Sequence, residues 1–170
     1  MTMNDGFFRA AAATPAIRVA DCQHNAEAVA ELMEEAAARG VQAVVFPELC
    51  LTGYTCGDLF LQKPLLDAAE RELAALIERT AGLPVLAAVG VPVPVNGALY
   101  NCAAVFCGGR LLGLSAKSCV PNYGEFYEAR HFTPAPECVE VSFAGFSVPL
   151  GSSLLYRPEG WEDCAVGVEI

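Results

Sequence analysis

Residues 44–54 read VVFPELCLTGY, an apolar segment followed at once by a carboxylate. The β-branched and aromatic residues 44–46 predict a buried strand. Pro47 lacks an amide donor and cannot continue a central ladder, so Glu48 emerges at the carboxyl end of that strand. Ligands bind at this edge of open α/β sheets, and the stretch therefore predicts a functional carboxylate. The alternative is a solvated loop residue, since glutamates are mostly exposed.

The segments before this stretch complete a β-α-β unit. Residues 16–20 alternate as a first strand, Asn25 is the expected N-cap of a helix, and Gly40 is its expected stop. The apolar residues between them recur at helical spacing: Ala26, Val29, Ala30, Met33, Ala36 and Ala37. This order predicts two parallel strands joined by a right-handed crossover.

The remaining chain predicts a mixed sheet. Pro64 opens a second helix that ends near Gly82, and Asn96-Gly97 marks a hairpin turn. Further strands are expected at 85–91, 99–106, 110–115, 139–143, 146–148 and 163–170. Pro149 is expected to stop the strand at 146–148. Residues 117–136 are polar and aromatic without a clean period, which predicts a long functional loop.

Composition restricts the class of protein. The chain has 170 residues, 54% of them hydrophobic, and a formal charge of -10. Such length suits one domain with a core, and the apolar excess predicts self-association. The negative charge argues against nucleic acid. No apolar run reaches the roughly 18 residues of a membrane span. The absence of a secretion signal predicts a cytoplasmic protein.

The eight cysteines form no Cys-x-x-Cys pair, and His24 and His131 are the two histidines. This pattern predicts no metal site. In a reducing compartment cysteines persist as small buried hydrophobes, so most of the eight are expected in the core.

A second polar cluster, KSCVPNYGEFYE at residues 117–128, directly follows a predicted strand. Lys117 is therefore expected to project at a strand end neighbouring that of Glu48, with the two side chains in contact directly or through one water. A structural ion pair is the alternative, because such pairs also form without chemistry.

The motifs around Glu48 and Lys117, with GDLF at 57–60 and YNCA at 100–103, resemble in order and spacing the nitrilase (carbon-nitrogen hydrolase) superfamily. Within it they look like the glutaminase domain of the glutamine-dependent NAD+ synthetase family. The resemblance implies an α/β fold, an α-β-β-α sandwich with mixed sheets, incomplete in this chain. It also implies that residues 1–170 are the N-terminal part of a glutaminase domain, without the synthetase domain.

The resemblance assigns roles residue by residue. Glu48 matches the general base, Lys117 the cation that stabilises the oxyanion, Glu128 a supporting glutamate, and Tyr123 a residue that contacts glutamine. The family's nucleophilic cysteine follows Gly-Val-Glu-Ile, which here is residues 167–170, the end of the chain. No nucleophile is therefore expected in this chain, and the chain alone is expected to be inactive.

The family further implies glutamine as substrate, ammonia passed to a synthetase domain that amidates deamido-NAD+, and ATP with Mg2+ only for that second domain. No cofactor is expected for the glutaminase part. Two alternatives remain open: another nitrilase-type amidase, and a non-catalytic association module.

Overall fold

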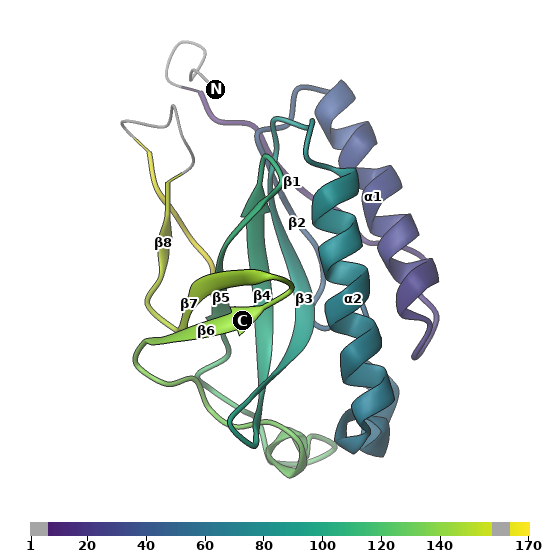
Figure 1. Ribbon diagram of the computed structural model, residues 1–170, viewed down its shortest axis with the longest axis vertical. Coiled ribbons are helices and arrows are strands. Elements are labelled where there is room, and N and C mark those ends of the chain that lie inside the picture. Colours follow the sequence, from purple (N-terminus) through teal and green to yellow (C-terminus); the bar gives the residue numbers. More distant parts are fainter. Residues whose placement is uncertain (1–6, 158–163) are drawn as a thin grey trace.

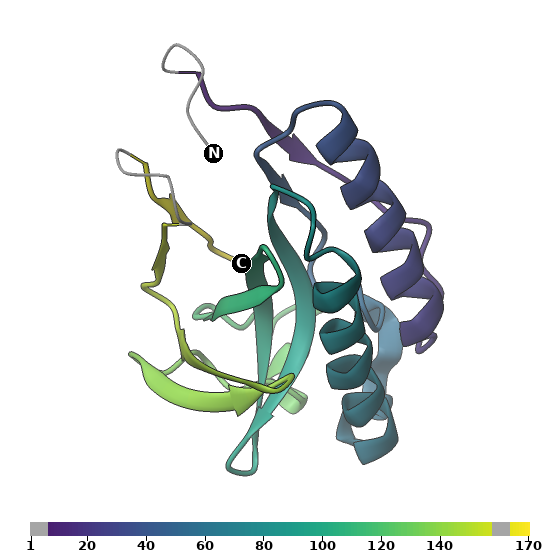
Figure 2. The same ribbon diagram turned by 45° about the horizontal axis from the view of Figure 1, so that its top comes forward.

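The structure is a computed structural model, and it describes residues 7–157 and 164–170. A twisted seven-stranded sheet carries two long helices on one face, as Figures 1 and 2 show. Across the sheet the strand order is β1-β2-β3-β4-β5-β7-β6. The strand bounds are β1 Ala10–Ala12, β2 Ala43–Val45, β3 Leu86–Val95, β4 Ala98–Cys107, β5 Arg110–Ala116, β6 Val139–Phe143 and β7 Phe146–Gly151. β1, β2 and β3 are parallel, and β4 and β5 follow as antiparallel neighbours. The expected mixed sheet is confirmed.

Helices α1 (Cys22–Ala38) and α2 (Lys63–Arg79) bury the apolar stripes that the sequence predicts. The N-cap of α1 is Asp21, whose carboxylate accepts from the His24 amide at 3.1 Å. The expectation that Asn25 caps this helix is wrong, because Asn25 lies inside it and is fully buried. Gly40 follows the helix with φ +69°, a backbone conformation that glycine adopts without strain.

The first strand is residues 10–12, so the expectation of a strand at 16–20 is wrong. Pairing with β2 decides the position, in the register Ala10 to Ala43. Residues 16–20 instead approach the Glu48 loop, where the Ala20 amide donates to the Thr52 carbonyl at 2.7 Å.

Two strands run beyond their expected ends at residues 91 and 148 and continue through prolines. β3 continues through Pro92 and Pro94. The backbone N–H groups of alternate residues in this strand point toward β2, and β2 pairs with β3 only as far as Ala88. A proline nitrogen directed to that unpaired side loses no ladder bond. β7 likewise continues past Pro149 to Gly151, which pairs with Ser115 of β5.

The sheet face opposite the helices is covered in part by β8 (Leu155–Tyr156) and β9 (Val166–Gly167), an antiparallel pair. A buried strand is expected over residues 163–170, and its first residue, Asp163, lies outside the described residues. For residues 164–170 the expectation of a buried strand is wrong, since β9 has two residues and its neighbours are half-buried or exposed. A groove of about 300 Å³ lies here, between Val45, Val105 and Val168. No helix in the described ranges is long and apolar enough to cross a membrane.

Candidate active site

The segment that carries Glu48 crosses over the neighbouring strand. A Cβ placed on Gly90 of β3 would lie 2.2 Å from the Leu49 nitrogen and 2.5 Å from the Pro47 carbonyl oxygen. The Leu51 amide then donates to the Gly90 carbonyl at 3.2 Å. Only a residue without a side chain permits this approach. The crossing brings Glu48 from the end of β2 across β3 to β4 and β5.

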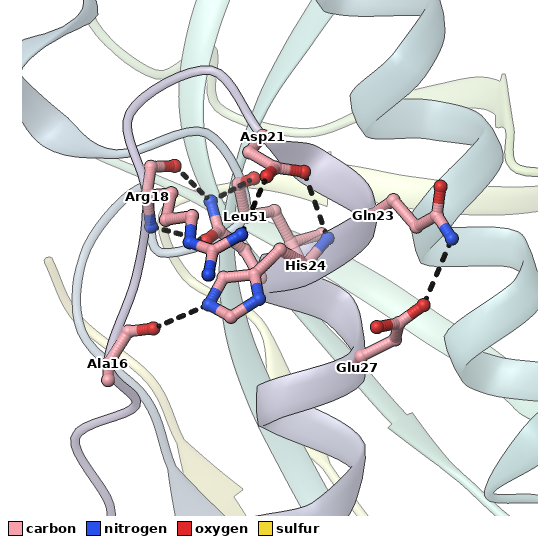
Figure 3. Close-up of polar contacts among 8 residues, drawn as sticks. Ala16, Arg18, Asp21, Gln23, His24, Glu27 and Leu51 are labelled. Carbon is pink, nitrogen blue, oxygen red and sulfur yellow. Dashed lines mark hydrogen bonds and ion pairs between the residues drawn. The ribbon is translucent and has the colours of Figure 1, made fainter.

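The loop after Glu48 is held by backbone and buried polar contacts. Leu49 is fully buried with φ +52°, a conformation that costs about 1–3 kcal/mol for a residue with a side chain. Its carbonyl accepts from the Gly53 amide at 2.8 Å. Asn25 donates to the carbonyls of Arg18 at 2.8 Å and Leu51 at 3.0 Å, residues that lie side by side at the start of α1 in Figure 3. The first turn of α1 therefore fixes the loop.

Glu48 and Lys117 meet as expected: the Lys117 Nζ lies 2.7 Å from Glu48 Oε1. The expected contact is confirmed. Their strands are not neighbours, however, since β3 and β4 lie between β2 and β5, and that part of the prediction is wrong. The contact exists because the strand ends share one edge of the sheet and the Gly90 crossing spans the gap.

Lys117 is shared between two carboxylates. Its Nζ lies 3.0 Å from Glu128 Oε2, and both of these side chains are at most 9% exposed. Glu128 begins the short 3-10 helix η2 (Glu128–Arg130), and its amide donates to the Pro121 carbonyl at 3.1 Å. Tyr54 donates its hydroxyl to Glu128 Oε1 at 2.6 Å. Burial first, and then this bond, raise the pKa of Tyr54.

The ammonium of Lys117 stays charged in this setting. Burial by itself lowers the pKa of Lys117, but the hydrogen bonds to Glu48 and Glu128 outweigh it, and the pKa lies above its ordinary 10.5. An ammonium has three N–H donors, and two serve the carboxylates. Glu128 Oε2 also lies 3.0 Å from Nζ, so the ammonium faces three carboxylate oxygens.

An ion-pair clamp fixes η1 (Tyr54–Leu61) against η2, and with it Tyr54 against Glu128. Asp58 accepts from Arg130 Nε at 2.7 Å and lies 3.0 Å from His131 Nε2. The bonds from Arg130, and then His131, lower the pKa of Asp58. A cavity of about 260 Å³ lies beside this clamp, lined by Tyr54, Glu128 and His131 among others.

Tyr123 is not gathered into this cluster. Its side chain is 72% exposed and packs edge-on against Phe126, with ring centroids 5.9 Å apart. Its expected contact with glutamine stays a prediction. The sequence alone assigned no role to two residues that contact the carboxylates. The side-chain amide of Asn101 donates to Glu48 Oε1, and the hydroxyl of Tyr54 donates to Glu128. Both lie within the quoted motifs, but nothing in those motifs shows that their side chains face the carboxylates.

The cysteines near the site do not replace a nucleophile. Cys50 is buried, its thiol points to the Gly90 carbonyl at 3.8 Å, and burial raises its pKa to about 12. A thiol held protonated is a poor nucleophile. Cys119 is exposed and Cys102 is buried with a raised pKa. Among the residues that the structure describes, no three His, Cys, Asp or Glu side chains lie together as metal ligands.

The comparisons agree with this geometry. Residues 9–166 match the carbon-nitrogen hydrolase family model. The chain belongs to the carbon-nitrogen hydrolase family. Relatives with the name glutamine-dependent NAD(+) synthetase include that of Mycobacterium tuberculosis, 36% identical over 166 residues, and that of Aquifex aeolicus, 32% identical over 145. The first match covers 97% of this chain and 24% of the relative, and the second covers 85% and 25%.

Solved structures give the same fold. A glutamine-dependent NAD(+) synthetase from Cytophaga hutchinsonii superposes with a TM-score of 0.85 at 28% identity, over 94% of this chain and 27% of that one. A nitrilase-superfamily amidase from Nesterenkonia superposes at 0.65 with 22% identity, over 88% and 56%. The nitrilase-type α/β fold is thus confirmed. The chain spans about a quarter of the length of the synthetases it matches.

Proposed function

We propose that this chain supplies the general base and the oxyanion-binding cation of a glutaminase site, as the N-terminal part of the glutaminase domain of a glutamine-dependent NAD+ synthetase. The observation that carries the proposal is the buried ammonium of Lys117, held between the carboxylates of Glu48 and Glu128. Similarity to synthetases over nearly the whole chain supports glutamine as the amide.

In this proposal the nucleophile is a cysteine that follows Ile170. Glu48 takes the thiol proton as sulfur bonds to the amide carbon, and the ammonium of Lys117 stabilises the oxyanion. The proton passes from Glu48 to the leaving nitrogen, the C–N bond breaks, and ammonia departs from a thioester. Water then attacks the thioester as Glu48 accepts its proton. The C–S bond breaks as Glu48 returns that proton to the sulfur, which releases glutamate and the free thiol. Glu128 keeps Lys117 in place.

The partners follow from the same proposal. The ammonia goes to a synthetase domain for amidation of deamido-NAD+, in the cytoplasm. ATP and Mg2+ serve that domain, and no step assigned to Glu48, Lys117 or Glu128 involves them. Another amidase of the family remains the second candidate, and Nesterenkonia amidase shares the fold alone.

The test joins this chain, after Ile170, to the continuation of the Mycobacterium tuberculosis relative; we name the product the extended chain. It is expected to release glutamate and ammonia from glutamine. The 170-residue chain is expected to release none, because it lacks the nucleophile. Glu48→Gln in the extended chain should lower kcat by about 100-fold or more, since a carboxamide accepts no proton.

The control is Glu27→Gln, on the exposed part of α1, which should keep full activity. A folded extended chain without glutaminase activity contradicts the proposal. So does glutamate release by the 170-residue chain that survives Cys50→Ser and Cys119→Ser together.

Self-association remains a prediction of the sequence, and the partly covered sheet face supports it. Phe8, Val45 and Val168 line the groove on that face, and Val45 is 48% exposed. We expect a dimer that buries more than about 1,000 Å² in total. Sedimentation at tens of micromolar checks this. A stable monomer that binds no hydrophobic dye contradicts it.

A further inference from the structure

Asn101 is a buried residue of β4 whose side-chain amide bonds to a carboxylate through its nitrogen while its oxygen has no partner among the described residues. It is 1% exposed, and its Nδ2 donates to Glu48 Oε1. Its Oδ1 is buried without a hydrogen-bond partner in the described part of the chain. An unsatisfied buried acceptor destabilises the fold and calls for an explanation.

The explanation lies in the chemistry of the amide. Rotating the side chain by half a turn would place Oδ1 against Glu48 Oε1, two acceptors without a proton between them. The carboxylate therefore fixes the orientation of the amide. The backbone of Asn101 also belongs to the site, since its carbonyl accepts from the Lys117 amide at 2.8 Å. Asn101 therefore bonds to Glu48 through its side chain and to the Lys117 backbone through its carbonyl.

The two side-chain bonds to Glu48 end on the same oxygen. Asn101 Nδ2 and Lys117 Nζ both donate to Oε1. Among the described residues Oε2 receives no hydrogen bond, and the Glu48 side chain is 29% exposed. The carboxylate is therefore held at one oxygen and presents the other.

We propose that Asn101 is a positioning residue for the general base: by holding Glu48 Oε1 together with Lys117, it makes Oε2 the oxygen that takes and returns the proton. This inference rests on the proposed glutaminase function. The ionisable groups that surround Glu48 in the described residues are Lys117 after β5, Glu128 in η2 and Tyr54 in η1.

The decisive variant is Asn101→Asp, which keeps the size of the side chain and replaces the donor by a carboxylate. Two facing carboxylates share a proton, so the pair keeps that proton to a higher pH. In the extended chain, the acid limb of kcat/KM against pH should move upward by about one unit or more. Asn101→Ala should lower kcat on the order of 10- to 100-fold, with KM little changed, because a hydrogen bond to a charged group is lost.

The matched control is Ser115→Ala, which removes a buried hydrogen bond of β5 to Tyr156, 2.9 Å long, two residues before Lys117. It should lower stability and leave the pH profile in place. If Asn101→Asp and Asn101→Ala behave like Ser115→Ala, with a wild-type profile and kcat, Asn101 is merely structural and the proposal is overturned.

A second measurement separates this inference from the proposed function. In the 170-residue chain, the ¹³C carboxyl resonance of Glu48, identified by its loss in Glu48→Gln, is titrated. Asn101→Asp should shift its midpoint upward and Ser115→Ala should not. If the midpoint shifts but the extended chain is inactive, the proposed glutaminase function is rejected and the contact of Asn101 with Glu48 is supported. An active extended chain in which Asn101→Asp shifts neither the midpoint nor the acid limb rejects the positioning role.

Discussion

Gly90→Ala is expected to destabilise the chain by about 3 kcal/mol or more, a large effect for one methyl group. The new Cβ would lie 2.2 Å from the Leu49 nitrogen and 2.7 Å from the Glu48 carbonyl carbon. Both are backbone atoms, and no rotation of a side chain relieves the clash. The segment must lift off β3, which also removes Glu48 from Lys117. Urea denaturation followed by circular dichroism measures the free energy of unfolding.

Gly82→Ala is the matched control. A Cβ at Gly82 would meet no atom within 4 Å, and the residue is exposed just after α2. Its effect should stay within about 0.5 kcal/mol. Equal stability of the two variants would show that the chain does not cross β3 at Gly90.

Lys117→Met is the second large effect, with an expected loss of about 3–5 kcal/mol at pH 7. Methionine is also unbranched, with a side chain one atom shorter, and leaves Glu48 and Glu128 facing each other without a cation. Lys63→Met is the control, because the Lys63 side chain is 82% exposed and its pair with Asp67 lies on the surface. That change should cost less than about 1 kcal/mol.

The loss should depend on pH in a defined direction. The pKa of Lys117 is raised in the fold, so its contribution is fully present below about 10.4 and is lost as pH rises through the folded pKa. The stability difference from Lys117→Met should therefore be constant near pH 7–9 and shrink as pH rises through the folded pKa of Lys117. A difference independent of pH would mean that the ion pairs do not stabilise the fold.

The contact between Glu48 and Lys117 could be predicted because it depends on a rule about sheets. Two residues that follow strands running the same way emerge at one edge, whatever lies between the strands. The role of Asn101 could not, because the alternation of β4 assigns a residue to a face without saying what crosses that face. Gly90 was the available signal, since an isolated glycine within an apolar strand suggests a close backbone approach.

The wrong strand boundaries have a common physical cause. β1 is three alanines, which have little intrinsic preference for a strand, and its place is set by pairing with β2. Pro92 and Pro149 were expected to bound their strands, yet β3 continues through Pro92 and Pro94 beyond the part that β2 pairs, and β7 continues through Pro149. Intrinsic strand propensity depends on a few neighbouring residues, whereas the ends of these strands are set by pairing with strands distant in the sequence.

The crossing over Gly90 also sets an order in which the molecule can assemble. β3, β4 and β5 are joined by short turns and pair locally, so little chain entropy opposes them. Glu48 reaches Asn101 across 53 residues and Lys117 across 69, and its landing place on β3 exists only once that strand is paired. Contacts of such separation form late and slow the folding of a domain. Glu48, the proposed general base, thus reaches its place only after the strands beneath it have paired.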